Sequence, residues 1–155
     1  GADVGLRSVG TGALDGLRLE KSYGIWSTEL RQSFSPEMSN LRHHAPFDKG
    51  DFMGRDAGLR QRKKGVDRVL VTLRIDAKDA DASGFEPVKR DGKLIGFVTS
   101  GAYGPHIDQS LALAYIDKGL VGSGASLTVD VIGENRPAVM LSEPAYDPQG
   151  KRLRS

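Results

Sequence analysis

From residue 66 onward, hydrophobic and polar positions alternate with a period of two, the pattern of β-strands that are buried on one face. The alternation is clearest in 69–75, where Thr72 and Arg74 separate apolar positions. Asp91-Gly92 stands between two later runs, and this dipeptide favours a two-residue hairpin turn. The six runs, with Gly and Pro between them, predict a small antiparallel barrel. They cover residues 69–75, 86–90, 93–99, 111–116, 127–132 and 138–142.

The residues before these strands have helical spacing instead. We expect one short helix over 11–21, with Thr11 as its N-cap, and a second over 55–62 that ends in a basic cluster. The chain is therefore predicted to be an α+β protein, mainly β. An N-terminal helical segment, 1–65, precedes a six-stranded antiparallel barrel domain, 66–155.

A carboxylate falls on the apolar face that we predict for the first helix. Ala13, Leu14 and Leu17 share one side of it, and Glu20 lies beside them at about 100° per residue. Because burying an unpaired charge is costly, Glu20 should have a specific partner. The residues leave two interpretations open. Glu20 forms a salt bridge with a neighbouring Arg or Lys, or its carboxylate lines a cleft.

In a cleft, the Glu20 carboxylate could accept two hydrogen bonds from a planar donor such as the aminopyrimidine ring of a pterin. A pterin presents an exocyclic amino group beside a ring N–H, so both carboxylate oxygens would be used. Tyr23 or Trp26, close by in the sequence, could cover the face of such a ring.

Composition excludes several other kinds of site. The 155 residues contain no cysteine, which rules out disulfides, thiolate metal ligands and a cysteine nucleophile. The net charge of +2 is too small to indicate nucleic-acid binding, and the basic residues of 60–68 and 151–154 are interpreted as solvated surface. No apolar run approaches the roughly 20 residues that span a bilayer. We therefore expect no nucleic-acid partner and no membrane partner, and a cytoplasmic protein.

The remaining motifs favour neither a metal site nor a hydrolase. His43 and His44 are adjacent and His106 is remote, so no spacing for metal ligands emerges. Ser100-Gly101 is expected in a turn at a strand end, without a histidine and carboxylate at informative spacing. We therefore predict no metal site and no serine hydrolase site.

Five segments, taken in order, resemble the glycine cleavage T-protein family over nearly the whole chain. They are Ala13–Trp26, Asp48–Asp56, Asp91–Tyr103, Ser110–Ile116 and Glu143–Pro148. The Leu-Glu-Lys sequence within the first segment, followed by its Trp, is most similar to the fused members, the dimethylglycine and sarcosine dehydrogenases. Each segment alone is weak evidence for the family, but five segments in the same order make a specific match.

The resemblance implies a role in one-carbon transfer. Such fused enzymes oxidise an N-methyl amine in an N-terminal FAD-dependent region, and tetrahydrofolate then takes up the one-carbon unit in the T-protein-like region. By resemblance Glu20 is the pterin-binding glutamate, Lys49 is a basic residue of the folate site, and the part from about Val69 onward is the small barrel domain. The family's catalytic aspartate lies upstream of the glutamate, and we expect it, most of the folate-binding domain and the flavin region to lie outside this chain.

The chain departs from the family pattern in one segment, and two alternative functions remain open. Residues 39–45 replace a Pro-Leu-Glu-Ala-Gly-Leu-like segment of the family. The rivals are a piece of a stand-alone aminomethyltransferase that acts with a lipoyl carrier protein, and a non-catalytic module whose basic cluster at 60–68 binds RNA or a protein. We expect this part alone to be inactive. The sequence leaves open which amine is the substrate and what the oligomeric state is.

Overall fold

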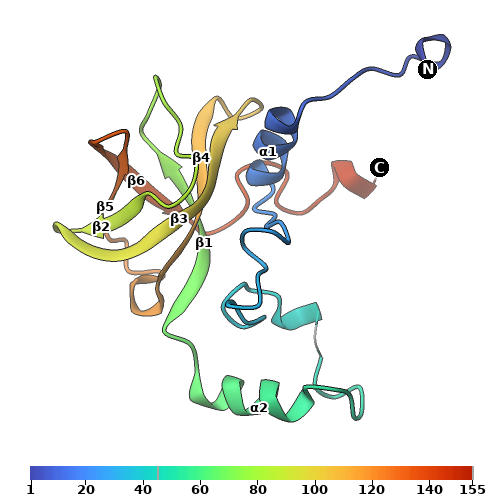
Figure 1. Cartoon of the computed structure of the whole chain (residues 1–155), viewed down its shortest axis with the longest axis vertical. Coiled ribbons are helices and arrows are strands. Elements are labelled where there is room, and N and C mark those ends of the chain that lie inside the picture. The colour runs from blue at the N-terminus through green and yellow to red at the C-terminus, as the bar shows by residue number, and fades with distance from the viewer. Residues whose placement is uncertain (45, 155) are drawn as a thin grey trace.

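The computed structural model describes residues 1–44 and 46–154, in which six antiparallel strands form a closed barrel (Figure 1). The predicted fold class is confirmed. The strands are β1 (Arg68–Ile75), β2 (Pro87–Arg90), β3 (Lys93–Gly104), β4 (Gln109–Asp117), β5 (Leu127–Val131) and β6 (Glu134–Leu141). Their order around the barrel is β1-β4-β3-β2-β5-β6, and β6 closes it by pairing with β1.

The β2–β3 hairpin turns where the sequence predicts it. Asp91 and Gly92 both have positive φ, 49° and 75°. A two-residue turn of type I′ requires positive φ at both central positions, and Asp-Gly adopts it at low cost. Arg90 pairs with Lys93 on either side of the turn, so the turn sets the register of the hairpin.

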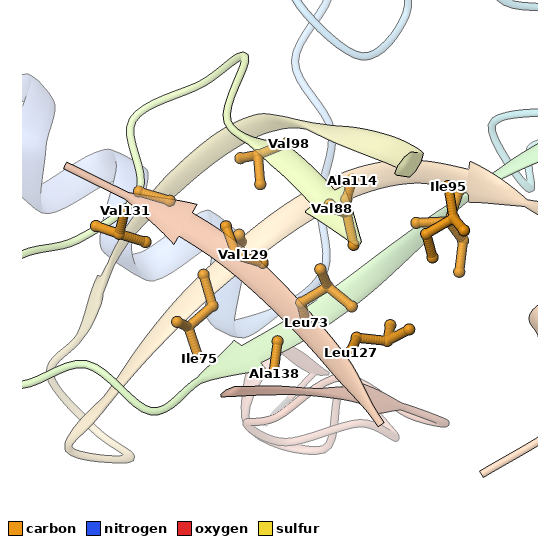
Figure 2. Packing of buried hydrophobic residues seen from close by; sticks show 13 residues of the cluster. Leu73, Ile75, Val88, Ile95, Val98, Ala114, Leu127, Val129, Val131 and Ala138 are labelled. Atoms are coloured by element: carbon orange, nitrogen blue, oxygen red, sulfur yellow. The ribbon is translucent and has the colours of Figure 1, made fainter. Parts of the chain in front are cut away.

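The barrel interior is filled by aliphatic side chains from all six strands (Figure 2). Leu73 and Ile75 of β1 point inward at alternate positions, and Val129 and Val131 do the same on β5. Closure of the sheet gives these side chains neighbours on every side, and it leaves no unpaired strand edge. The period-two pattern in the sequence reflects this inside-outside alternation.

The third strand is longer than its hydrophobic pattern indicates. We expected it to end at residue 99, but β3 continues to Gly104 and bulges between Val98 and Ser100 where it pairs with β4. Ser100-Gly101 is therefore inside the strand, and the expected turn at this position is wrong. Gly101 is needed there because a Cβ would lie 2.3 Å from the carbonyl oxygen of Ala82.

The N-terminal segment carries two helices, α1 (Thr11–Glu20) and α2 (Arg55–Lys64). α1 begins at Thr11, but Gly10 is the N-cap, so the expected Thr11 cap is wrong. Short 3₁₀ turns occur at Ala2–Val4, Arg42–His44, Lys118–Leu120 and Arg152–Arg154. α1 lies beside the barrel and the C-terminal tail, whereas α2 lies at the opposite end of the long axis (Figure 1). Across the described ranges, no helix has the length and apolar character needed to cross a membrane.

The buried face of α1 is not the face that its apolar residues predict. Ala13, Leu14 and Leu17 are exposed, whereas Arg18, Leu19 and Glu20 are buried. Gly16 makes this possible: a Cβ there would lie 2.7 Å from the carbonyl oxygen of Tyr103, so only glycine lets the helix approach β3 this closely. The helix packs through its smallest residue, and apolar periodicity does not report such a contact.

Candidate functional site

Glu20 ends α1 with a carboxylate that is only 1% exposed. One residue satisfies both of its oxygens. The main-chain N–H of His106 donates to Oε1 over 2.6 Å, and Nδ1 of the same histidine lies 2.7 Å from Oε2. A buried carboxylate without donors would be strongly destabilising, so this pair accounts for the burial of Glu20.

The turn between β3 and β4 delivers His106 to this position. A Cβ on Gly104 would lie 3.0 Å from Cγ of Glu20, so the chain passes directly over the carboxylate. Pro105 packs against Gly16 of α1, where a Cβ would lie 3.3 Å from the proline ring. The β3–β4 turn and the C-terminal end of α1 are therefore fitted to each other across a close backbone contact.

The C-terminal tail covers the other side of His106. The Tyr146 ring stacks on the imidazole with the centroids 4.5 Å apart. The Tyr146 N–H donates to the main-chain oxygen of Glu20 over 3.0 Å, and Arg152 donates to the Tyr146 hydroxyl over 2.8 Å. Nearby, Lys21 pairs with Asp147 at 3.3 Å. Three segments far apart in the sequence, the end of α1, the β3–β4 turn and the C-terminal tail, thus meet around Glu20.

The observed environment of Glu20 differs from both interpretations that the sequence left open. Its partner is an imidazole and a main-chain N–H, and no guanidinium is bonded to it among the residues described. An adjacent hollow of about 530 Å³ is lined by Gly16, Leu17 and Pro105, and Glu20 is not part of its lining. One carboxylate oxygen accepts from a main-chain N–H and the other faces an imidazole nitrogen, so both oxygens have partners within the protein.

The other residues assigned to the folate site lie apart from this pair. The ring of Tyr23 is more than half exposed and the side chain of Trp26 is 80% exposed, and within the described ranges neither has a ring contact or hydrogen bond with Glu20. Lys49 precedes α2, and its Nζ lies 4.4 Å from the centroid of the Phe52 ring. The structure brings Glu20 to His106 and not to Lys49, because α1 lies beside the barrel whereas α2 lies far from it along the long axis of the molecule (Figure 1). The roles of all four residues stay predictions.

Sequence reasoning missed His106 and Tyr146 as neighbours of Glu20. His106 is 86 residues away in the sequence, and it was considered only as a metal ligand. The usable signal was Gly104-Pro105, which marks a tight turn at the end of a strand. To predict that this turn contacts α1, one must know the order of the strands around the barrel, and local sequence patterns do not give that order.

A second buried carboxylate holds the N-terminal segment on the barrel. Glu29 accepts hydrogen bonds from the Ile25 N–H and the Ser100 hydroxyl, and its Oε2 lies 3.5 Å from Nη1 of Arg18. Its main-chain oxygen accepts from the Tyr115 hydroxyl over 2.8 Å. The network thus ties residues 18–29 to β3 through Ser100 and to β4 through Tyr115.

The segment in which the sequence departs from its expected relatives is partly described. Ser39 is buried and lies 2.7 Å from the Tyr115 hydroxyl, and Asn40 donates to the Leu70 carbonyl over 2.8 Å. The rings of His43 and His44 lie 4.0 Å apart. Ala45 lies outside the described residues. The segment is thus tied to the barrel at its start.

Comparison with known proteins identifies the family. The model of the glycine cleavage T-protein C-terminal barrel domain matches residues 68–147, which is the barrel together with the start of the tail. The solved structure of the glycine cleavage system aminomethyltransferase T from Bartonella henselae superposes with a TM-score of 0.84 at 26% identity, covering 94% of this chain and 41% of that one.

Curated relatives cover nearly the whole chain. Human mitochondrial dimethylglycine dehydrogenase is 35% identical over 99% of this chain, and an aminomethyltransferase from Rippkaea orientalis is 36% identical over 92%. The chain spans 18% of the first protein and 39% of the second. The family model, the relatives and the superposition agree with one another, and they show that the chain belongs to the glycine cleavage T-protein family.

Proposed function

We propose that this chain is the C-terminal part of a dimethylglycine- or sarcosine-type demethylating dehydrogenase, in which it helps to bind tetrahydrofolate. The observation that supports the proposal most directly is the Glu20 carboxylate. It is buried, and its two oxygens lie 2.6 Å from the main-chain nitrogen and 2.7 Å from the ring Nδ1 of His106. The aminopyrimidine edge of a pterin offers donors of the same kind.

Of the two cofactors that the family implies, the proposal assigns residues of this chain to tetrahydrofolate. Glu20 would hold the pterin edge of tetrahydrofolate, with an aromatic side chain over the ring, and Lys49 would supply positive charge in the folate site. Tetrahydrofolate supplies an acceptor for the one-carbon unit. For FAD the proposal assigns no residues of this chain, because the flavin would belong to a separate N-terminal region of the parent protein.

In this proposal the chain's residues bind, orient and exclude water. A carboxylate that accepts two hydrogen bonds fixes both the position and the rotation of a planar ring, which lowers the entropic barrier to reaction at that ring. The barrel and the β3–β4 turn would close one side of the site. Exclusion of water would protect a reactive one-carbon species from hydrolysis to formaldehyde.

The test compares Glu20→Gln with the unchanged parent protein. Gln keeps the shape of the side chain but loses its charge and replaces one acceptor oxygen with a donor. We expect binding of 5-formyltetrahydrofolate, measured by calorimetry, to weaken at least tenfold, while reduction of the flavin by the amine stays unchanged. In turnover with tetrahydrofolate, more of the one-carbon unit should appear as free formaldehyde. Equal folate affinity in the two proteins would refute the assignment.

A stand-alone aminomethyltransferase is the second candidate, and the superposition on the Bartonella henselae aminomethyltransferase supports it. It would use the same folate site without a flavin. A Gly-rich dinucleotide-binding fingerprint upstream of this chain favours the dehydrogenase, and a protein without bound flavin favours the transferase. The cytoplasm stays the predicted compartment, although the name of the human relative places that protein in mitochondria.

A further inference from the structure

We propose that the exposed apolar face of α1, together with the hollow beside it, binds the region that precedes this chain in the parent protein. The inference rests on one part of the proposed function, that the chain is the C-terminal part of a longer protein. It does not depend on the folate assignment, because none of the residues assigned to folate takes part in it.

The apolar face of α1 lies in solvent although the helix is packed on the barrel. We call Ala13, Leu14 and Leu17 the α1 face, and its two leucines are 58% and 41% exposed. The contact with the barrel is made on another side, through Gly16 and the buried Leu19. A helix of a globular protein turns its apolar stripe toward a packing partner. α1 therefore has the character of a helix that lies between two domains, one of which is the barrel.

A hollow of about 530 Å³ adjoins the α1 face. The helix forms one wall, and the end of β3 with the following turn forms the other, where Tyr103 and Pro105 lie. Among the described residues that line the hollow, Asp81 alone carries a charge. A carboxylate that loses its water without gaining a partner is costly. The occupant should therefore fill the hollow with apolar side chains and place a Lys or Arg opposite Asp81.

Residues 1–10 form an arm that leads away from this surface (Figure 1). Val4, Leu6 and Val9 in the arm are between 74% and 77% exposed. The N–H groups of Val4 and Leu6 both donate to the Gly1 carbonyl, so these bonds hold the arm to itself and not to the barrel. Single exposed apolar residues are ordinary, but a series of them that continues into an apolar helix face indicates an interaction surface.

The comparison with a solved relative indicates the occupant. This chain covers only 41% of the Bartonella henselae aminomethyltransferase T, so more than half of that protein lies outside the superposed part. In the parent protein a corresponding region would be joined to α1 through the arm. A region on so short a tether has an effective concentration on the order of millimolar, which favours it over a second copy or a separate protein.

Trypsin tests the proposal in the parent protein, because Arg7 lies in the arm and is exposed in this chain. Leu14→Asp places a charge on the α1 face and should release the preceding region from it. Cleavage after Arg7 should then become at least roughly tenfold faster than in the unchanged parent. Ile132→Asp is the matched control, since Ile132 is 83% exposed in the β5–β6 turn, and it should leave the rate unchanged. Equal rates for Leu14→Asp and the unchanged parent would overturn the proposal.

In the 155-residue chain the Leu14 side chain has no such partner to lose, so the effect is confined to the longer protein. Asp81→Asn tests the expected cation in the same way. It should also speed cleavage after Arg7, by a smaller factor than Leu14→Asp. A rate that Asp81→Asn leaves unchanged would refute the cation opposite this carboxylate.

Cross-linking identifies the occupant without disrupting the contact. A photoreactive phenylalanine analogue in place of Tyr103 keeps an aromatic ring in the wall of the hollow. It should form cross-links within one polypeptide, to peptides that precede Gly1 in the parent protein. Links between two copies, seen as a covalent dimer, or links to this chain's own residues alone would refute the assigned occupant.

Folate binding separates this inference from the proposed function. If Leu14→Asp exposes Arg7 while Glu20→Gln keeps full affinity for 5-formyltetrahydrofolate, the folate assignment fails and the docking surface stands. If Glu20→Gln loses folate while Leu14→Asp leaves Arg7 as it was, the docking surface alone is refuted.

Discussion

Arg18 of α1 and Glu29 form a buried ion pair within the N-terminal segment. Nη1 of Arg18 lies 3.5 Å from Oε2 of Glu29, and the two side chains are 8% and 0% exposed. Glu29 also accepts the Ser100 hydroxyl of β3. Because Glu29 is fully buried, loss of its charge weakens the contacts of the Ser100 hydroxyl and of Arg18, which keeps its bonds to Asp15 and to the Tyr23 carbonyl.

We therefore expect Glu29→Gln to lower the free energy of unfolding by about 3 kcal/mol, since one partner of a buried pair is lost. Urea unfolding at pH 7, followed by circular dichroism, measures it. Glu37→Gln is the matched control, because Glu37 pairs at 2.8 Å with Arg62, which is largely exposed. That change should cost less than about 1 kcal/mol. Equal losses in the two variants would contradict a structural role for the buried pair.

Gly96 of β3 has no room for a side chain beside the neighbouring strand. A Cβ at Gly96 would lie 2.1 Å from the Tyr115 carbonyl oxygen and 2.8 Å from Cα of Ile116. Gly96→Ala must therefore push β3 and β4 apart, and we expect it to cost about 3 kcal/mol or more. Gly119→Ala has open space around the new methyl group and should be within about 0.5 kcal/mol of the unchanged protein. Similar thermal midpoints for the two variants would disprove the contact.

Ionisation of the Tyr115 phenol makes the free energy of unfolding depend on pH in the alkaline range. Burial raises the pKa of its phenol above the ordinary 10.0, the Glu29 carboxylate raises it further, and the bond to Ser39 opposes both. The folded state therefore keeps the proton to higher pH than the unfolded state, and stability falls as pH rises through and above the unfolded pKa. The hydroxyl donates to the main-chain oxygen of Glu29 only while it is protonated, whereas the ionised oxygen could still accept from Ser39.

We expect Tyr115→Phe to cost about 1–2 kcal/mol at pH 7, where the protonated hydroxyl makes both hydrogen bonds. Its deficit relative to the unchanged protein should shrink between about pH 9 and pH 11, as the phenol of the unfolded chain ionises. Urea titrations across this range measure the difference, with Tyr23→Phe as an exposed control. A deficit that is the same at every pH would show that Tyr115 does not carry the alkaline loss.

The barrel could be predicted from sequence because its determinants are local. Alternation along each strand follows from one buried face, and Asp91-Gly92 encodes the turn of the hairpin. Six such runs in a small chain have few arrangements in which all edges are paired. The end of β3 was missed for a local reason too. Glycine usually indicates the end of a strand, but Gly101 lies inside β3 and lets its backbone pass close to Ala82.

The surroundings of Glu20 could not be predicted in the same way. Its partners, His106 and Tyr146, reach it only after the barrel has closed and the tail has returned to α1. The apolar pattern of α1 was also misleading, since the helix packs through Gly16 and a buried Arg18. Long-range polar contacts leave no periodic trace in the sequence, so the burial of Glu20 could be expected but not its partner.

The reversed face of α1 gives the last prediction. Leu19 is fully buried and packs in a cluster with Leu70, Leu111 and Tyr115, whereas Leu14 on the same helix is 58% exposed. Leu19→Ala should cost about 3 kcal/mol, because it removes buried methyl groups and leaves a cavity, and Leu14→Ala should cost less than about 0.5 kcal/mol. Hydrogen exchange of the α1 amides distinguishes local release of the helix from unfolding of the barrel. If Leu14→Ala were the more damaging change, the helix would pack through its apolar stripe after all, and Glu20 would face away from His106.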